Sequence, residues 1–399
     1  MAWITSPEAA AALSDAAGLG RDLGAAEALQ RRYGLSSDQR AAVLTQAELR
    51  AKAAARWGQP TDRLFFTRDG LEQASRPAVA KWRADRLRSI GVQSVADLGC
   101  GLGFESLAFA HAGLQVTAVE IDETTADLAR ANLDGTSAHV IVGDITDAAV
   151  LDPLLDGADA LFLDPARRDP KAPRTIDGLS GHRVADPEDW SPSWSWIASL
   201  ATRKPRTVVK VAPGINHSLI PERGSAVWTA VDGDLVEASI WFPGFSDLPV
   251  RSAQSFAFGG HATLDSTMPT SDTVAPVASV LLDVAPVVSR SGLVTTLAAT
   301  ANAHRIDEHI AYLATDVTPA PSPFYTSYRV LDAMPFDRKR IGDALASLNA
   351  GSLTVMKRGF AADTELLRKQ WLKRCKGSEQ LVVALTRLGD DPYAIICTR

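Results

Sequence analysis

The sequence predicts an α/β fold built around a mostly parallel, Rossmann-like β-sheet, and three observations support this. Short apolar runs between residues 94 and 211 alternate with helical stretches of about ten to fifteen residues, which is the pattern of βαβ units. A glycine-rich turn follows the first of these runs, as in nucleotide-binding sheets. The length of 399 residues exceeds that of one ordinary domain, so we expect further units beside the sheet.

The first part, residues 1–74, is expected to be helical. Ala, Leu, Gln, Arg and Glu dominate most of it, and its apolar positions recur at helical spacing. The run Ser36-Ser37-Asp38-Gln39 is a typical helix start. Basic and acidic side chains balance here, with nine of each, so this region gives no indication of a charged partner.

The second part, residues 75–265, holds the predicted sheet. We expect strands at 94–98, 114–120, 138–142, 160–164 and 207–211, and helices at 77–89, 105–112 and 123–133. Residues 235–243 and 253–259 are expected to form an antiparallel pair that closes this sheet.

The third part, residues 281–399, follows a Ser/Thr/Pro-rich stretch at 260–279 that we predict to be a linker. Its pattern is mixed α/β, with helices expected at 298–313, 338–348 and 364–374 and strands at 352–357, 380–386 and 394–397. Between Arg329 and Lys376 the chain has eleven basic and five acidic residues. Such a cluster fits a polyanionic partner, and it equally fits a solvated basic helix face.

Composition and motif spacing exclude several classes of protein. Hydrophobic residues make up 46% and charged residues 22%, which indicates a globular chain rather than a disordered or fibrous one. No run of eighteen apolar residues is present, so we expect no membrane span. The three cysteines form no CxxC pair and the histidines no HExxH motif, so we expect neither a disulfide framework nor a metal site. The N-terminus lacks the basic start of a signal peptide, and we predict a cytoplasmic protein.

The turn Gly99-Cys-Gly101-Leu-Gly103 discriminates between two nucleotide-type cofactors. A dinucleotide site favours GxGxxG, but here the third glycine comes one residue early. S-adenosylmethionine (SAM) has no diphosphate, and its turn lets the backbone approach a methionine and a ribose. Asp97 ahead of the turn, and Glu120 at the next strand end to bind ribose hydroxyls, favour SAM. Asp144, after the third strand, is placed to accept from the adenine amine; acidic strand ends arising by chance are the alternative.

With these strand ends, residues from about 75 to 260 resemble a class I SAM-dependent methyltransferase. The segment from Phe65-Phe66-Thr67-Arg68-Asp69-Gly70 to Ala80 resembles the lead-in of RNA-guanosine methyltransferases of the trimethylguanosine-synthase type. There the corresponding turn lies across the methionine end of SAM. The resemblance implies that Gln73 and Ser75 close over that end of the cofactor.

The tail from about residue 281 to 399 is similar to the THUMP-like C-terminal domain of uncharacterised bacterial methyltransferases. The residues that carry this resemblance are Lys357-Arg358-Gly359 through Leu366 and Arg368, together with Arg387 and Ile396. Relatives with a THUMP domain imply RNA as the partner. The resemblance therefore implies that Lys357, Arg358 and the surrounding basic cluster contact RNA phosphates.

Asp164-Pro165-Ala166-Arg167-Arg168 follows the fourth predicted strand, where amino-methyltransferases carry (N/D)PP(Y/F/W). A carboxylate and a backbone carbonyl that accept both N–H bonds of a base amine would orient its lone pair toward the methyl group. Asp164 and the Pro165 carbonyl are suited to this. The sequence departs from the motif at Ala166 and Arg167, which puts base stacking there in doubt, and Arg167 and Arg168 can instead contact phosphates. An Asp164 that only lines the SAM pocket is the alternative.

Three further features of the sequence each have a structural and a functional interpretation. Lys210 ends the fifth strand, where it can meet a phosphate or a carboxylate, or simply lie in a strand-ending turn. Residues 166–195 form a long polar connection, which favours a substrate lid. The tryptophans at 190, 194 and 196 can stack bases, but their spacing favours packing against the sheet, and Cys100 is expected to pack rather than react.

The sequence therefore predicts transfer of a methyl group from SAM to a base amine of structured RNA, guanine N2 or adenine N6. Two alternatives remain open. One is a DNA or small-molecule methyltransferase, in which the basic tail has no part in turnover. The other is a non-catalytic RNA-binding protein that retains the SAM fold as a scaffold.

Overall fold

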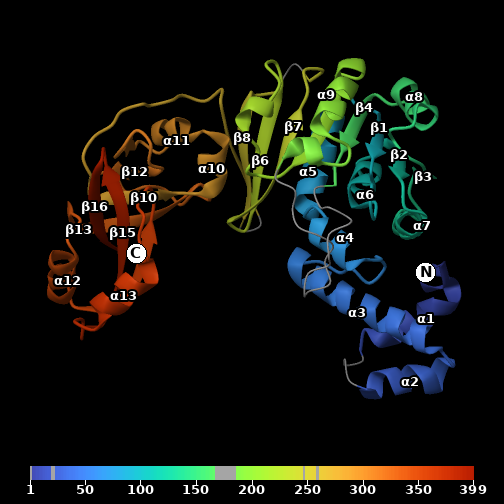
Figure 1. The fold of residues 1–399 in the computed structure, drawn as a ribbon, viewed down its shortest axis with the longest axis horizontal. Coiled ribbons are helices and arrows are strands. Elements are labelled where there is room, and N and C mark those ends of the chain that lie inside the picture. Colours follow the sequence, from blue (N-terminus) through green and yellow to red (C-terminus); the bar gives the residue numbers. More distant parts are fainter. Residues whose placement is uncertain (1, 19–22, 167–185, 246–247, 258–259) are drawn as a thin grey trace. The chain divides into compact units, whose positions relative to one another are not determined.

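A computed structural model describes residues 2–18, 23–166, 186–245, 248–257 and 260–399 (Figure 1). The chain divides into two compact units. The first comprises Met1–Val211, His217–Gly224 and Ser239–Asp247, and the second comprises Ala212–Asn216, Ser225–Ala238 and Leu248–Arg399.

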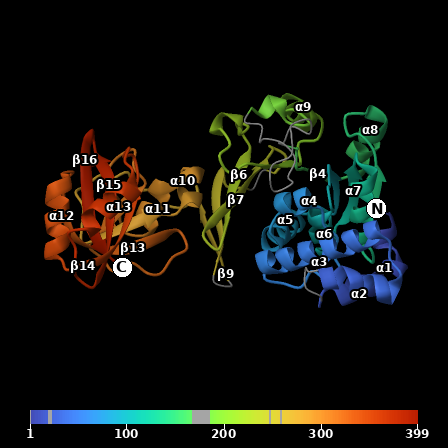
Figure 2. The same ribbon diagram turned by 60° about the horizontal axis from the view of Figure 1, so that its bottom comes forward.

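The first unit begins with helices, as predicted. They are η1 (Ala2–Thr5), α1 (Pro7–Ala16), α2 (Leu23–Tyr33) and α3 (Ser37–Trp57), and α1–α3 lie together in Figure 2. A capping box starts α3, because Ser36 accepts from the Gln39 amide while the Gln39 side chain accepts from the Ser36 amide. Gly58, with φ of 65°, ends it in the left-handed conformation. The helices share a core with Phe66 and Leu71 of the segment that follows.

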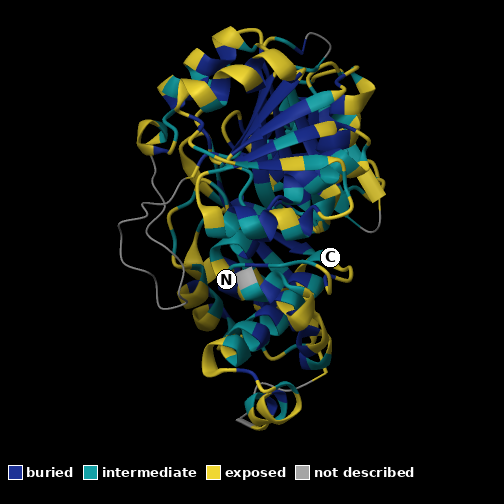
Figure 3. Cartoon of the chain, turned by 90° about the vertical axis from the view of Figure 1, so that its right-hand side faces the viewer, coloured by how far each residue is buried: buried dark blue, intermediate teal, exposed yellow. Residues whose placement is uncertain are grey.

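The parallel sheet of this unit is confirmed with boundaries within a residue of those predicted. Its strands are β1 (Ser94–Leu98), β2 (Gln115–Glu120), β3 (Ala138–Val142), β4 (Ala160–Leu163) and β5 (Thr207–Val211). The helices are α4 (Arg68–Gln73), α5 (Pro77–Ser89), α6 (Phe104–His111), α7 (Glu123–Asn132), α8 (Ala148–Gly157) and α9 (Trp194–Arg203), with η2 (Pro187–Asp189) and η3 (His217–Leu219). Strands β4 and β5 are buried at every position. Figure 3 draws buried residues in dark blue and shows dark blue strands in the interior.

The strand order β3-β2-β1-β4-β5 determines where a ligand can bind. All four neighbouring pairs are parallel. The chain moves outward from β1 through β2 to β3 and then returns to the other side of β1 to form β4. Adjacent crossovers diverge at such a switch point, so the carboxyl ends of β1 and β4 border an open crevice.

The predicted antiparallel pairing of residues 235–243 with 253–259 is wrong. The strands are β6 (Ser225–Val231), β7 (Asp234–Trp241), β8 (Arg251–Ala257) and β9 (Gly260–Asp265), and the full order is β3-β2-β1-β4-β5-β7-β6-β8-β9. Strand β8 pairs in parallel with β6 and antiparallel with β9. Strand β6 was not predicted, nor was the reversal after it at Asp232-Gly233, where φ values of 51° and 88° form the left-handed two-residue turn that Asp-Gly favours.

The second unit contains a seven-stranded sheet of order β11-β12-β10-β13-β16-β15-β14. From residue 280 onward, the elements of this unit are β10 (Val280–Val284), α10 (Pro286–Ser291), α11 (Val294–Thr300), β11 (His304–Arg305), β12 (Tyr312–Thr315), β13 (Tyr325–Pro335), α12 (Arg338–Ser347), β14 (Ala350–Lys357), α13 (Thr364–Leu372), β15 (Glu379–Leu388) and β16 (Asp391–Thr398). Helices α12 and α13 share a core with β14–β16.

Two predictions for this region need correction. The helix expected at 298–313 is wrong, because α11 ends at Thr300 and the chain continues into β11 and β12. Asn302, with φ of 48°, leaves the helical conformation, and the buried run Tyr312–Thr315 pairs with β10 instead. The polar stretch 260–279 is also not wholly irregular, since its first six residues form β9.

Candidate active site

The glycine turn after β1 faces open space. Gly99 and Gly101 have φ values of 85° and 55°, and a Cβ built on either would meet no atom within 4 Å. Only glycine adopts such angles without strain, so the turn keeps a backbone edge clear for a ligand. Glu120, at the end of β2, accepts from the Gly101 amide at 2.9 Å through Oε2 and from the Asp122 amide at 3.0 Å through Oε1. The second strand end and the turn are thereby held together.

Asp97, at the end of β1, is 1% exposed, and only one of its two carboxylate oxygens has a hydrogen-bond partner among the described residues. Its Oδ2 accepts from the Ser106 hydroxyl at 2.6 Å, whereas Oδ1 is buried and has no partner among the described residues. Burial raises the pKa of Asp97 to about 7, assisted by the negative charges of Glu105, Asp164 and Glu120. A buried acceptor without a donor costs about 1–3 kcal/mol, so a bound cation or N–H group would stabilise this site.

The lead-in segment is held against the glycine turn by one side chain. Asn132, at the end of α7, accepts from the Phe65 amide at 2.7 Å and donates to the carbonyls of Phe65 and Leu102 at 3.0 and 2.9 Å. Gly70 also lies against the turn, because a Cβ there would fall 2.3 Å from a methyl carbon of Leu102. This places α4 and the residues after it beside the turn.

At the end of β4, Asp164 forms an ion pair with Lys210 of β5. The Lys210 ammonium donates to Oδ2 of Asp164 at 2.6 Å and to the Gln73 carbonyl at 2.8 Å. Within the described residues, Oδ1 of Asp164 has no hydrogen-bond partner. Pro165 is buried, and the next residue, Ala166, exchanges two backbone hydrogen bonds with Ser191. The turn after β4 is therefore fixed on both sides of Pro165.

Beneath this turn lies a buried ion pair that the sequence analysis missed. Arg83 of α5 and Glu105 of α6 approach to 2.5 Å, with side chains 1% and 9% exposed. Burial acts to raise the pKa of Glu105, but Arg83, Lys210 and a hydrogen bond with Ser75 lower it below its ordinary value. Arg83 also lies over the Phe162 ring of β4, 5.0 Å from its centre.

The position of Arg83 in the sequence already indicates that it is buried with a partner. Arg83 lies four residues after Val79 and four before Leu87, on the buried stripe of α5. A charge on an apolar stripe indicates a buried partner, because an unpaired buried charge is strongly destabilising.

The other residues predicted for the cofactor lie at the same edge of the sheet. Ser75 is buried against Glu105, and the Gln73 side chain is exposed while its carbonyl accepts from Lys210. Asp144, exposed after β3, accepts from the amide and the hydroxyl of Thr146 through Oδ1 alone. These two bonds lower the pKa of Asp144 and leave Oδ2 without a partner among the described residues.

The residues predicted to contact substrate phosphates do not form one site in the described structure. Arg167 and Arg168, like most of the connection predicted as a lid, lie outside the described residues. Lys357 is exposed, and its ammonium donates to the Ala362 carbonyl at 2.6 Å. Arg358 is turned inward, with Nε donating to Asp283 at 2.8 Å and the guanidinium 5.3 Å from the centre of the Tyr312 ring. The side chain of Arg358 therefore makes contacts within the second unit, with Asp283 and Tyr312.

Two of the three tryptophans pack as expected, whereas Trp196 is partly exposed. Trp190 and Trp194 are buried with their ring centres 6.2 Å apart, and Trp194 packs against Phe242. Burial raises the pKa of the Cys100 thiol well above its ordinary value, which makes it a poor nucleophile.

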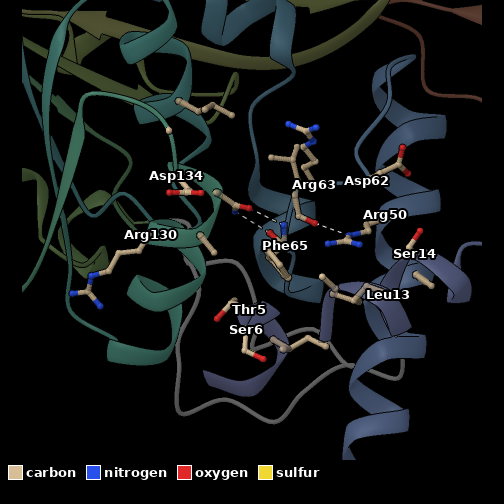
Figure 4. A pocket seen from close by; sticks show the side chains of 18 of the residues that line it. Thr5, Ser6, Leu13, Ser14, Arg50, Asp62, Arg63, Phe65, Arg130 and Asp134 are labelled. Atoms are coloured by element: carbon tan, nitrogen blue, oxygen red, sulfur yellow. Dashed lines mark hydrogen bonds between the residues drawn. The ribbon is translucent and has the colours of Figure 1, made fainter. Parts of the chain in front are cut away.

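A separate cavity of about 1470 Å³ lies within the first unit, and no residue of the turn Gly99–Gly103 lines it. Arg50 of α3, Arg63, and Arg130 of α7 contribute to its lining, as do Asp62 and Asp134 (Figure 4). Arg50 donates to the Leu64 carbonyl at 2.8 Å, and burial lowers the pKa of its guanidinium. None of the residues predicted for the cofactor or the methyl transfer lines this cavity.

Comparisons with known proteins match two parts of the chain. Residues 95–165 match the family model of a methyltransferase domain, and residues 325–399 match a model described as THUMP domain-like. The chain is a methyltransferase with a THUMP-like C-terminal domain. Uncharacterized S-adenosylmethionine-dependent methyltransferases from two strains of Mycobacterium tuberculosis are 29% identical to it over 349 residues, which span 86% of this chain and 91% of theirs.

A solved structure supports the fold of the methyltransferase. The crystal structure of a methyltransferase candidate from Porphyromonas gingivalis W83 aligns with a TM-score of 0.66 at 19% identity, covering 92% of each chain. The predicted Rossmann-like fold is confirmed, and SAM as the predicted cofactor agrees with the description of the mycobacterial relatives. In the described part of the chain, no group of side chains is suited to a metal ion, and no helix has the length and apolarity of a membrane span.

Proposed function

We propose that this methyltransferase transfers the methyl group of SAM to an exocyclic amine of a base in structured RNA, guanine N2 or adenine N6. The observation that carries the proposal is the turn after β4. There Asp164 keeps one carboxylate oxygen without a partner, next to Pro165, whose carbonyl has no backbone hydrogen bond in the described chain. Two acceptors therefore lie side by side at the crevice where β1 and β4 end.

The residues at this crevice fit SAM. Asp97 offers a buried oxygen that has no donor in the described part of the chain, which suits the ammonium of the methionine part. Gly99 and Gly101 leave the backbone open to the cofactor, and Glu120 at the end of β2 is suited to ribose hydroxyls. Asp144 has an oxygen available for the adenine amine. When bound, SAM supplies an electrophilic methyl group on a positively charged sulfur.

The lead-in completes this arrangement. Asn132 holds Phe65 against Leu102 of the glycine turn, so α4 stays close to the cofactor crevice. Gln73 ends α4 with its side chain exposed, and Ser75 follows it. We assign both to the methionine end of SAM, where Gln73 contributes its side chain and Ser75 fixes the local backbone through Glu105.

Asp164 and Pro165 would act by orientation. The lone pair of an exocyclic amine is delocalised into the ring, which makes the amine a poor nucleophile. Acceptance of its two N–H bonds by Asp164 and by the Pro165 carbonyl directs the lone pair toward the methyl group. A bond forms between nitrogen and the methyl carbon as the carbon–sulfur bond breaks, and one amine proton leaves through Asp164.

The THUMP-like domain supports RNA as the substrate. The first turn of α12 carries Arg338, Lys339 and Arg340 and no acidic side chain, although positive charge at a helix N-terminus opposes the helix dipole. All three are exposed and form no ion pair in the described chain. The end of α13 is held close by, because Trp371 donates to the Arg338 carbonyl at 2.9 Å. This α12–α13 surface, Arg338–Arg340 with the exposed Lys369 and Lys373, suits a phosphate backbone.

The proposal is tested by transfer of labelled methyl from SAM into total RNA, DNA and protein from cells that lack the gene. The full-length wild type and Asp164→Ala are compared. We expect label in RNA from the wild type and a loss of about 100-fold or more in Asp164→Ala, with SAM affinity retained. Digestion to nucleosides then identifies the methylated atom.

The alternatives predict other outcomes. Label only in DNA, or in none of the macromolecules despite SAM binding, would support the DNA and small-molecule alternatives and remove RNA as the substrate. RNA binding without any label in the wild type would identify a scaffold. Equal label from wild type and Asp164→Ala would remove Asp164 from the chemistry.

A further inference from the structure

Lys210 lies inside the candidate site, where its ammonium contacts Asp164 and the backbone of Gln73. The residue is 5% exposed, and its ammonium contacts Oδ2 of Asp164 at 2.6 Å and the Gln73 carbonyl at 2.8 Å. A buried ammonium is held strongly by its partners, because breaking such a pair leaves an uncompensated charge. Contact with an RNA phosphate, as the sequence analysis considered, would require Lys210 to leave both.

We propose that Lys210 is a positioning residue, which occupies one oxygen of Asp164 so that the other is presented to the substrate amine. This inference rests on the proposed function of Asp164. The pairing divides the carboxylate into two acceptors with different tasks. Oδ2 is fixed by the ammonium, and Oδ1, which has no partner among the described residues, keeps its lone pairs for an N–H bond.

The same contact links the turn after β4 to the lead-in. Gln73 is the last residue of α4, and its carbonyl shares the Lys210 ammonium with Asp164. The positive charge of Lys210 also helps to hold Glu105 ionised beneath the site. Lys210 therefore sets the position of the acceptor relative to the segment that we assign to the methionine end of the cofactor.

This division explains why the site carries a carboxylate and not an amide. An amide has the same shape but only one acceptor oxygen and an NH2 group that donates. In Asp164→Asn the oxygen must face the Lys210 ammonium, so the NH2 group faces the substrate amine and two donors oppose each other. If Lys210 is replaced by Met, the amide is released and its oxygen can turn to the substrate.

The test is a double-mutant cycle in the full-length protein, with Asp164→Asn, Lys210→Met and both together. We expect Asp164→Asn to lower kcat about 100-fold. Lys210→Met should lower kcat about tenfold with KM for RNA within about twofold, because the loss is one of orientation. The double variant should recover about tenfold in kcat over Asp164→Asn, as expected when an opposed donor is removed.

Two outcomes would overturn the inference. One is a double variant that is no more active than Asp164→Asn. The other is a Lys210→Met variant with unchanged kcat and a raised KM for RNA, which identifies a phosphate contact. Lys204→Met is the matched control, since Lys204 donates to the Leu155 carbonyl and contacts no carboxylate in the described chain. It should leave both kcat and KM unchanged.

Folding and the proposed function are checked separately. SAM affinity and the melting temperature of each variant show whether it is folded, and Lys210→Gln replaces Lys210→Met if the latter does not bind SAM. Gln donates one N–H to Asp164 without the charge, so its kcat should lie between those of wild type and Lys210→Met. If Asp164→Ala retains full activity, the proposed function fails; if it is inactive but the cycle is additive, only the role of Lys210 fails.

Discussion

In the first unit, Arg83, Glu105 and Lys210 near the end of β4 are buried and paired, whereas in the second unit the basic side chains of α12 and α13 are mostly exposed. Arg83 and Glu105 are both within 9% of full burial, and Lys210 reaches Asp164 from a strand that is buried throughout. Arg338 and Lys339 have no ion-pair partner in the described chain.

The difference separates two uses of charge. A buried charged side chain stays oriented toward its partner, because a buried charge without a partner is strongly destabilising. It can therefore hold a carboxylate or a strand end in one orientation, as methyl transfer requires. An exposed charge has many orientations and is screened by salt, so it contributes affinity and encounter rate for a polyanion. Substitutions in the two units should accordingly change different measured quantities.

The largest expected effect is on folding stability. Glu105→Ala leaves the Arg83 guanidinium buried without its carboxylate, and should lower the free energy of unfolding by about 3–5 kcal/mol. Urea denaturation of the full-length protein measures this. Glu365→Ala is the matched control, because its ion pair with Arg368 is exposed and should contribute about 0.5 kcal/mol or less. Equal effects of both substitutions would contradict the comparison.

The next effect is on RNA binding. Replacing Arg338, Lys339 and Arg340 together by Gln should weaken RNA binding about 10- to 100-fold at physiological salt, and should reduce the slope of log Kd against log salt by about 2. The melting temperature and SAM affinity should not change. Replacement of the exposed Arg31, Lys52 and Lys81 of the first unit by Gln removes the same charge and serves as control. A loss of affinity in the control equal to that in the triple variant would indicate a general charge effect.

A smaller effect is expected from pH. Because the pKa of Asp97 is raised to about 7, its carboxyl is mostly protonated at pH 5.5 and half ionised at pH 7. The ionised form suits a cationic ligand, so SAM should bind about tenfold more tightly at pH 7 than at pH 5.5. Calorimetric titration measures this, and Asp97→Asn should bind weakly with no such dependence. A flat profile in the wild type would remove Asp97 from the cofactor site.

In the absence of SAM, the same raised pKa lowers the stability of the fold as the pH increases. The folded protein retains a proton on Asp97 that the unfolded chain releases above pH 4, so this residue makes the fold less stable as the pH rises from about 4 to 7. Asp97→Asn removes that dependence. At pH 8 the variant should therefore melt at a higher temperature than the unliganded wild type while it binds SAM less tightly.

The sequence was sufficient for features that follow from local pattern. Strands β1, β3 and β5 were predicted to the residue, since apolar runs bounded by turns define them. Asp97 and Glu120 could be assigned to one edge because carboxyl ends of parallel strands meet there. The partners of charged residues could not be predicted. Lys210 and Asp164 are separated by 46 positions, and their contact depends on the order of the strands and on side-chain direction.

Arg358 provides the smallest and sharpest test of the comparison, because it belongs to the second unit but is paired like a residue of the first. Its side chain and that of Asp283 are 25% and 27% exposed, so the pair is partly screened. Arg358→Gln should therefore lower the free energy of unfolding by about 1 kcal/mol. RNA affinity and its salt slope should remain those of the wild type. Lys357→Gln, one residue earlier and exposed, should leave stability unchanged and lower RNA affinity about twofold to threefold. If Arg358→Gln instead reduces the salt slope by about 1, its guanidinium leaves Asp283 for a phosphate, and burial no longer separates the two uses of charge.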